Sequence, residues 1–274
     1  MRLAPTLGIL AGMITAPWLC APARAQAVEA LRLSGAGSET AAPDPVVDRI
    51  LTRLEDRRVP DLRAKVQWKL EYVVDDEAEV KLGQLWFKDA PPVAQFKAHF
   101  TAKISGDRRQ ELDEQHMFDG HWYTELQSQG KTLTRREIRA PNDRRDPYRL
   151  GEGAFPLPFG QRKADILREF EVSLVAPDAK NDPPDTDHLK LVPRPGSQTY
   201  DTYQSVEFWI AREGANIAGL PVKVRVGKLD GEGSLNSHIT VVFGSPEVNV
   251  GLSDSIFKID KPAGFQEIVE RLES

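Results

Sequence analysis

The sequence contains little cysteine and little histidine. Cys20 is the only cysteine among 274 residues, and there are five histidines. One cysteine excludes an intramolecular disulfide framework and a zinc site built on cysteines. The formal net charge is −5, so the chain lacks the basic footprint of nucleic-acid-binding proteins and we expect no nucleic-acid partner.

Motifs for catalysis are also missing. The chain has neither a Gly-x-Ser-x-Gly elbow nor a His-Glu-x-x-His helix. Gly151-Glu152-Gly153 lacks the third glycine and the strand–helix unit of a dinucleotide-binding loop. We therefore predict a protein that is not an enzyme, with no catalytic residues and no cofactor.

One histidine pair hints at a metal. His116 and His121 flank Asp119-Gly120, and Asp113 and Glu114 lie nearby as oxygen donors. Because isolated surface histidines are far more common, we expect two exposed edge histidines and no metal site. A hydrolase or metal enzyme at this pair is kept as an alternative. The acidic cluster Asp182, Asp185 and Asp187 lacks the glycine and terminal glutamate of a calcium loop, so we expect a solvated loop.

Only one long apolar stretch is present, from Leu7 to Cys20. It follows a positive residue and precedes Ala23-Arg24-Ala25, the small-x-small pattern of a secretory signal peptide. The stretch is shorter than the roughly 20 residues that span a bilayer as a helix. We predict a signal peptide over 1–25, cleaved after Ala25, and a periplasmic protein. Lipid anchoring at Cys20 is disfavoured because the bulky Leu19 precedes it.

The remaining chain divides into a leader and one domain. Residues 26–45 are rich in Ala, Ser, Gly and Pro and predict a flexible leader. Residues 46–274 predict a single domain, which begins with a helix. Apolar residues there recur with helical spacing at Val47, Ile50, Leu51 and Leu54, after a capping Asp44 and Pro45.

The pattern then changes from a period of 3.6 to a period of 2. Apolar residues alternate with polar ones from Ala64 to Tyr72 and in many later segments, and Asp119-Gly120 gives a strong hairpin signal. We expect ten or eleven antiparallel strands and a short helix over 164–170. A strand over 256–259 and a helix over 265–272 complete the prediction. The role of the Pro/Asp-rich insert 177–195 stays open.

Every predicted strand has one apolar face, which is more apolar surface than two or three short helices cover. Such faces either pack into a filled core or hold an apolar ligand. Burying a methylene group is worth about 0.8 kcal/mol, so a sixteen-carbon chain gains on the order of 10 kcal/mol. A binding function of this kind needs few polar residues.

The order of these elements resembles the LolA-type family of outer-membrane lipoprotein carriers and lipoprotein-sorting proteins. The hairpin Phe118–Tyr123 is the most family-like piece. One departure lies in Val93–Phe100, where the family's carriers place an arginine and this chain has Gln95 and Lys97. The other matching segments are Ile50–Leu54, Gly83–Lys88 with Pro91-Pro92, Phe96–Phe100, Gly219–Pro221 and Phe257–Phe265.

The resemblance implies an α+β, mainly antiparallel fold: a curled open half-barrel with short helices covering its concave face. It implies a monomeric periplasmic carrier, or chaperone, that binds the acyl chains of lipoproteins or other lipids and exchanges them with inner- and outer-membrane transfer proteins. An envelope sensor of the same fold, binding a lipidated ligand and a membrane-protein partner, is the alternative. Phe155, Leu157 and Phe159 form a predicted lid. The predicted lipid-binding cavity comprises Val66, Trp68, Leu70, Leu85, Phe87, Phe96, Phe100, Val206, Phe208, Val224, Ile239 and Val241.

Overall fold

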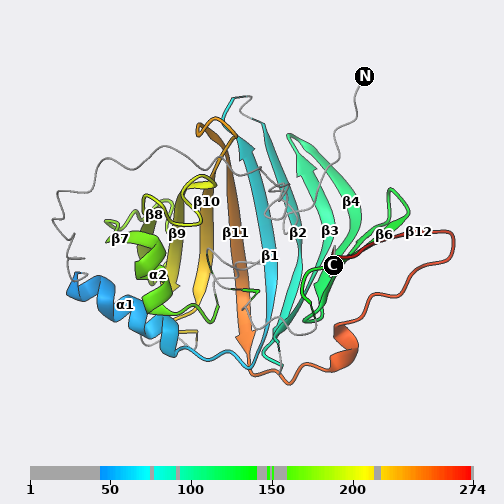
Figure 1. The fold of residues 1–274 in the computed structure, drawn as a ribbon, viewed down its shortest axis with the longest axis horizontal. Coiled ribbons are helices and arrows are strands. Elements are labelled where there is room, and N and C mark those ends of the chain that lie inside the picture. Colours follow the sequence, from blue (N-terminus) through cyan, green and yellow to red (C-terminus); the bar gives the residue numbers. More distant parts are fainter. Residues whose placement is uncertain are drawn as a thin grey trace, which may run out of the picture.

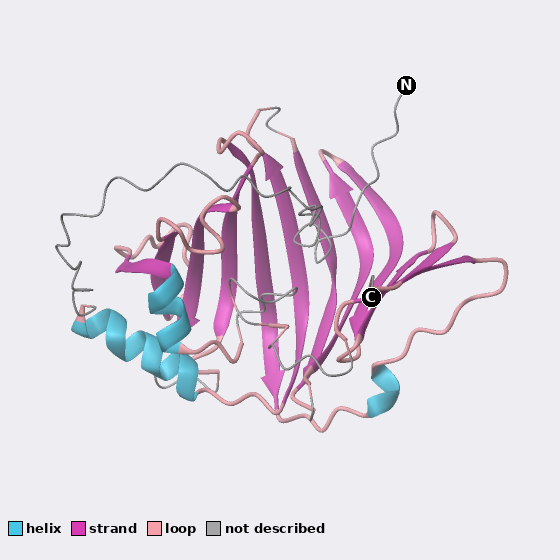
Figure 2. Ribbon diagram, in the orientation of Figure 1, coloured by secondary structure: helices cyan, strands magenta, loops and turns pink. Residues whose placement is uncertain are grey.

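The computed structural model describes residues 44–74, 77–90, 93–140, 147–148, 150, 159–212 and 217–272. The predicted signal peptide and nearly all of the predicted leader lie outside these residues. The described part is mainly one open sheet of twelve strands with two short helices (Figures 1 and 2). None of its helices is long and apolar enough to cross a membrane.

The first helix forms as its spacing predicts. Helix α1 spans Pro45–Asp56, and the Asp44 side chain accepts a hydrogen bond from the Val46 amide at 2.7 Å. That bond satisfies one of the free amides at the helix start. The four apolar residues predicted for one face are buried, and α1 and α2 (Lys163–Glu169) lie at the β7–β10 end of the sheet (Figure 1).

Two antiparallel meanders make the sheet. The first comprises β1 (Asp61–Tyr72), β2 (Ala78–Lys88), β3 (Gln95–Ser105), β4 (Arg108–Phe118), β5 (Trp122–Gln127) and β6 (Thr132–Glu137). The second comprises β7 (Phe170–Leu174), β8 (Thr186–Pro193), β9 (Tyr203–Ala211), β10 (Pro221–Leu229) and β11 (Leu235–Val248). Strand β1 pairs with β11 over most of its length, so the meanders form one continuous sheet.

The close approach of two strands requires glycine at position 83. The register of β2 and β3 shifts at Leu82/Gly83. A Cβ atom on Gly83 would lie 2.0 Å from the carbonyl oxygen of His99. No other residue fits there without moving β3.

The C-terminal prediction is wrong in two places. Instead of a strand over 256–259, a short 3-10 helix spans Asp254–Ile256, with the Ser253 side chain accepting from the Ser255 amide. Instead of a helix over 265–272, strand β12 (Gln266–Glu270) pairs in parallel with β6. All five residues of β12 are exposed, so a helix here would have buried no apolar face, whereas the backbone of β6 offers hydrogen bonds.

Candidate functional site

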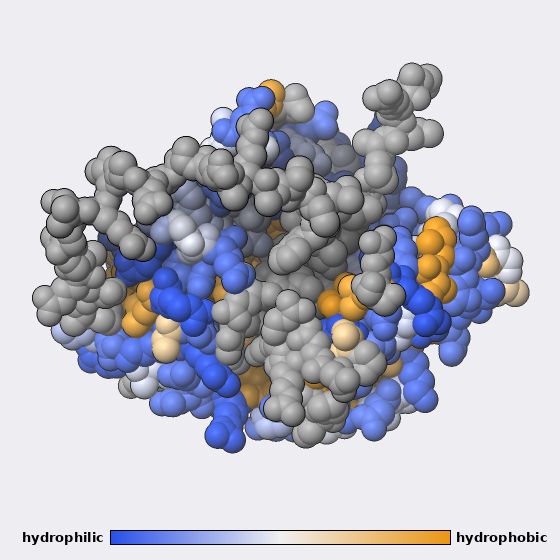
Figure 3. Space-filling model, viewed as in Figure 1, coloured by the Kyte–Doolittle hydropathy of each residue, from blue (hydrophilic) through white to orange (hydrophobic). Residues whose placement is uncertain are grey.

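The apolar residues of the sheet gather on the face that packs against α1, which we call the helix-side face. They form two clusters that share the half-buried Val224. The first cluster lies over β1 to β5 and β11. The second joins α1 and α2 to β8, β9 and β10. The described surface seen from the side of Figure 1 is mostly hydrophilic, with apolar residues in small patches (Figure 3).

All twelve predicted cavity residues belong to these two clusters. Of these twelve residues, the first cluster buries Val66, Trp68, Leu85, Phe87, Phe96, Phe100 and Ile239 and half-buries Leu70 and Val241. Val206 and Phe208 are buried in the second cluster. The twelve residues therefore share the helix-side face, and their role in holding a lipid stays a prediction.

Two aromatic residues outside the sheet pack on the first cluster. The Phe159 ring lies 5.8 Å from Phe87 and 5.3 Å from Phe243, measured between ring centroids. The Tyr148 ring meets those of Phe87, Phe96 and Phe118 edge to face. Phe159 is thus the predicted lid residue that the structure places on the face.

The other two lid residues, Phe155 and Leu157, lie outside the described residues. The chain on either side of them is tied together by Gln161. Its side chain donates to the Tyr148 carbonyl oxygen at 2.7 Å and accepts from the Leu150 amide at 2.9 Å. Gln161 is 3% exposed, so these bonds are shielded from water.

A chain of buried polar groups crosses the same face at β2, β4 and β5. The Lys81 ammonium donates to both carboxylate oxygens of Glu114, at 2.8 and 2.9 Å. Glu114 also bonds to His116 Nε2 at 2.6 Å, and His116 Nδ1 bonds to the Tyr123 hydroxyl at 2.6 Å. The prediction of an exposed edge histidine is wrong for His116, which is fully buried.

These contacts change the acidity of two groups. Burial raises the pKa of the Glu114 carboxyl, but the hydrogen bond and charge of His116, together with Lys81, outweigh it and lower the pKa to about 2. Burial, and then the negative charge of Glu125, raise the pKa of the Tyr123 hydroxyl well above its ordinary value. Glu114 is therefore a carboxylate and Tyr123 a neutral phenol at ordinary pH.

The structure does not bring the two hairpin histidines together. His121 lies 3.1 Å from Glu137 and against the Trp122 ring, whereas His116 is engaged by Glu114 and Tyr123. Within the described ranges, no group of three or more metal-ligating side chains is found. One signal for the polar chain is present in the sequence, because Lys81 occupies an apolar-face position in the alternation with Leu85 and Phe87.

The acidic insert makes more contacts with the rest of the chain than a solvated loop would. Asp182 accepts a hydrogen bond from Trp209 Nε1, and the His188 ring stacks on the Trp209 ring at 4.0 Å. Asp187 accepts from Arg53 and Arg212. The solvated-loop prediction is wrong for Asp182 and Asp187, since these contacts tie the insert to β9 and to α1.

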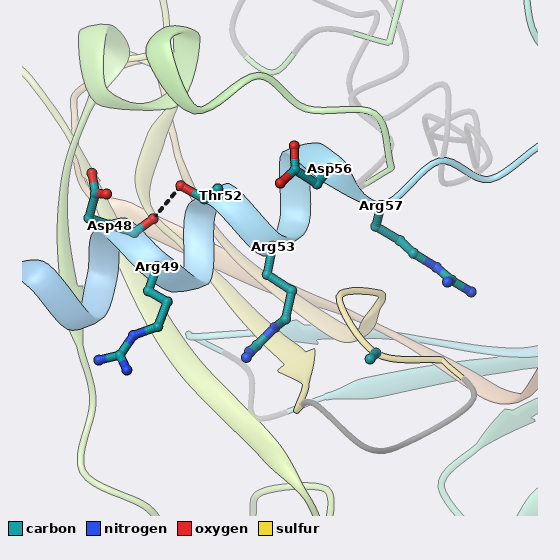
Figure 4. A pocket seen from close by; sticks show the side chains of 7 residues that line it. Asp48, Arg49, Thr52, Arg53, Asp56 and Arg57 are labelled. Atoms are coloured by element: carbon teal, nitrogen blue, oxygen red, sulfur yellow. Dashed lines mark hydrogen bonds between the residues drawn. The ribbon is translucent and has the colours of Figure 1, made fainter.

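A pocket of about 590 Å³ lies beside α1, away from the predicted cavity residues. Arg49, Arg53 and Arg57 extend from one side of the helix, and Asp48 and Thr52 from another (Figure 4). Asp48 is paired with Lys163, and Arg53 with Asp187. Sequence reasoning missed this pocket, because it attends only to the apolar stripe of α1.

Comparison with known proteins gives structural matches alone. No family model and no curated protein matches the chain. An uncharacterized conserved protein from Thermus thermophilus is 14% identical with a TM-score of 0.46, over 82% of this chain and 99% of that one. MucB is 13% identical with a TM-score of 0.43, over 82% of this chain and 66% of MucB. A LolA superfamily protein from Nitrosomonas europaea is 13% identical with a TM-score of 0.37, over 77% and 97%.

The solved structures that match the chain thus include a protein of the LolA superfamily, the family that its sequence resembles. At TM-scores below 0.5, nothing about ligand or partner follows from these likenesses. The functional proposal rests on the faces of this sheet.

Proposed function

We propose that this chain is an exported, non-enzymatic carrier that binds the acyl chains of lipoproteins or other lipids on the helix-side face and shuttles them towards the outer membrane. The observation that carries the proposal is the continuity of the apolar face across both meanders, with Val224 shared by the two clusters. Residues 46–274 are the binding domain, and residues 1–25 direct export to the periplasm. The carrier acts as a monomer between inner- and outer-membrane transfer proteins.

The twelve cavity residues line the bound hydrocarbon, and Phe155, Leu157 and Phe159 form the lid. Support for the lid comes from Phe159, whose ring lies on Phe87 and Phe243. An acyl chain enters by replacing the rings of Phe159 and Tyr148 on the face. The exchange keeps apolar area buried in both states, so the bound and empty forms differ little in exposed hydrocarbon.

Binding without covalent chemistry is consistent with the state of the polar groups on the face. Lys81, Glu114 and His116 bond to one another. A nucleophile or general base needs a free lone pair directed at a substrate. The Lys81 ammonium has none, and Glu114 and His116 bond to neighbouring side chains. Their role in this proposal is structural: they hold β2 and β4 together beside the bound lipid.

Native mass spectrometry of protein purified from a periplasm tests the proposal. We expect a mass above that of the bare chain, which falls to the bare mass after mild organic extraction. A bare mass before and after extraction contradicts a lipid carrier.

A matched pair of variants locates the lipid. Leu70 and Glu71 are neighbours on β1 with side chains on opposite faces, and Leu70 lies on the apolar cluster. Leu70→Gln lowers the fraction of lipid-loaded protein, because it places an amide against the hydrocarbon, and Glu71→Gln leaves the fraction unchanged. Thermal unfolding of both variants confirms that they are folded.

A further inference from the structure

Trp68 has an unusual environment for a buried tryptophan. It lies on β1, near the middle of the strand order, and is 4% exposed. Its indole Nε1 is buried and has no hydrogen-bond partner among the residues that the structure describes. An indole N–H is a donor only, and buried tryptophans usually pair it. An unpaired buried donor therefore requires an explanation.

The described side chains around Trp68 leave its indole N–H without a hydrogen bond. Its partners across the sheet are Val241 on β11 and Lys81 on β2. Val66 and Leu70 flank it along β1 on the same face. The Lys81 ammonium lies 5.4 Å from the centroid of the Trp68 ring and is itself a donor, already bonded to Glu114. Among the described residues, the indole N–H thus has hydrocarbon and an ammonium beside it, while the carboxylates of Glu79 and Glu114 are bonded to Lys81 and Lys103.

The charges beside Trp68 indicate what kind of acceptor fits. Lys81 and Lys103 are balanced by Glu79 and Glu114, with which they form ion pairs. Lys81, Lys103 and His116 are each already bonded to one of these two carboxylates, so none of them is left to pair with a further, desolvated carboxylate. A neutral oxygen attached to hydrocarbon meets both requirements, since it accepts a hydrogen bond and needs no counter-charge.

We propose that the Trp68 indole N–H donates a hydrogen bond to the carbonyl oxygen of an ester- or amide-linked acyl chain bound on the helix-side face. The inference rests on the proposed function and adds the chemical class of the ligand and its direction. The hydrocarbon runs from Trp68 along Val66, Leu85 and Phe87, which continue the apolar cluster. The polar part of the ligand lies towards the paired charges of Lys81 and Glu114.

Two probes that differ in one carbonyl group test the inference. Monopalmitoylglycerol carries an ester, and hexadecylglycerol has the same head and chain length with an ether in its place. We expect the wild-type chain to bind the ester about tenfold more tightly, as measured by competition against one fluorescent acyl probe. Trp68→Phe removes the donor and keeps an apolar ring, so the two probes bind this variant equally.

Trp86→Phe is the matched control. Trp86 is a half-buried tryptophan on β2 whose side chain lies on the opposite face from Leu85 and Phe87. This variant retains the preference for the ester.

The possible failures are distinguishable. Equal affinity of the wild-type chain for ester and ether overturns the role of Trp68 while the carrier function stands, and this result needs no variant to fold. A preference that survives in Trp68→Phe also overturns it. Failure of the wild-type chain to bind either probe overturns the inference together with the proposed function.

Discussion

Two single residues, Lys81 and Glu114, show how charged side chains are accommodated on the apolar helix-side face. Lys81 and Glu114 stand at apolar-face positions of β2 and β4, and each is less than a tenth exposed. A buried charge is tolerated only when it is paired and hydrogen-bonded, and each of these residues satisfies the other. The pair is part of the packed helix-side face. A lysine or a glutamate taken alone in the sequence does not predict such a buried pair.

Removing one member of the pair is therefore costly. We expect Glu114→Gln to lower the free energy of unfolding by about 3 kcal/mol, because the Lys81 ammonium loses the nearer of its two counter-charges. Denaturant unfolding measures the change. Glu111→Gln, at an exposed position of the same strand, is the control and shifts stability little. A cost in Glu114→Gln as small as that of the control contradicts the assigned role.

The double variant Lys81→Met with Glu114→Leu separates pairing from packing. It removes both charges and keeps apolar volume, so we expect most of the lost stability to return. If the double variant is as unstable as Glu114→Gln, the position depends on something other than the charge pair.

The same carboxyl makes stability depend on pH. The folded-state pKa of Glu114 is about 2, below the ordinary value of 4.5, so the unfolded chain takes up the proton first on acidification. The resulting stabilisation is complete above pH 4.5 and is lost as the pH falls from there through about 2. It amounts to about 3 kcal/mol at most.

Acid unfolding of the wild-type chain and of Glu114→Gln measures this contribution. The variant has no carboxyl to protonate at this position, so its stability changes less steeply between pH 4.5 and 2. If the stabilities of the wild type and the variant fall in parallel with pH, the Glu114 carboxyl has the same pKa in the folded and the unfolded chain, which contradicts the prediction.

At the scale of elements, local patterns predicted most of the structure. Helix α1 and the hairpin between β4 and β5 are specified by neighbouring residues, through the Asp44 cap and the Asp119-Gly120 turn. Strands β7 and β12 are not. Both are short strands at the edges of the sheet. Each is held by pairing with one neighbour, β8 for β7 and β6 for β12, and this pairing leaves no signal in the residues of the short strand itself. Helical spacing in the tail was misleading because its residues stay exposed and their backbone pairs with β6.

Gly83 gives a test of how closely β2 and β3 approach. We expect Gly83→Ala to destabilise the chain by about 1–3 kcal/mol, because its Cβ would lie 2.0 Å from the His99 carbonyl oxygen. Gly231→Ala is the matched control, since a Cβ there meets nothing within 4 Å. Equal unfolding midpoints for the two variants would contradict the close approach.

At the scale of the whole molecule, the pairing of β1 with β11 is the decisive connection. The sequence predicts strands and hairpins, but the pairing of residues 173 positions apart, as with Trp68 and Val241, leaves no local signal. This pairing joins two meanders and makes their apolar faces continuous. The candidate ligand residues could be named from the sequence because alternation assigns each to a face, whereas the buried polar chain could not.

Contact between an acyl chain and Trp68 is the most direct test of the account. Bromine quenches tryptophan fluorescence on contact. Among the tryptophans of the described residues, Trp68 belongs to the first cluster on the helix-side face, whereas Trp86, Trp122 and Trp209 do not. We predict that a brominated monoacylglycerol quenches the wild-type emission relative to the unbrominated lipid, and that Trp68→Phe abolishes this difference. Quenching that persists undiminished in Trp68→Phe, or its absence in the wild-type chain at saturating lipid, would contradict acyl binding on this face.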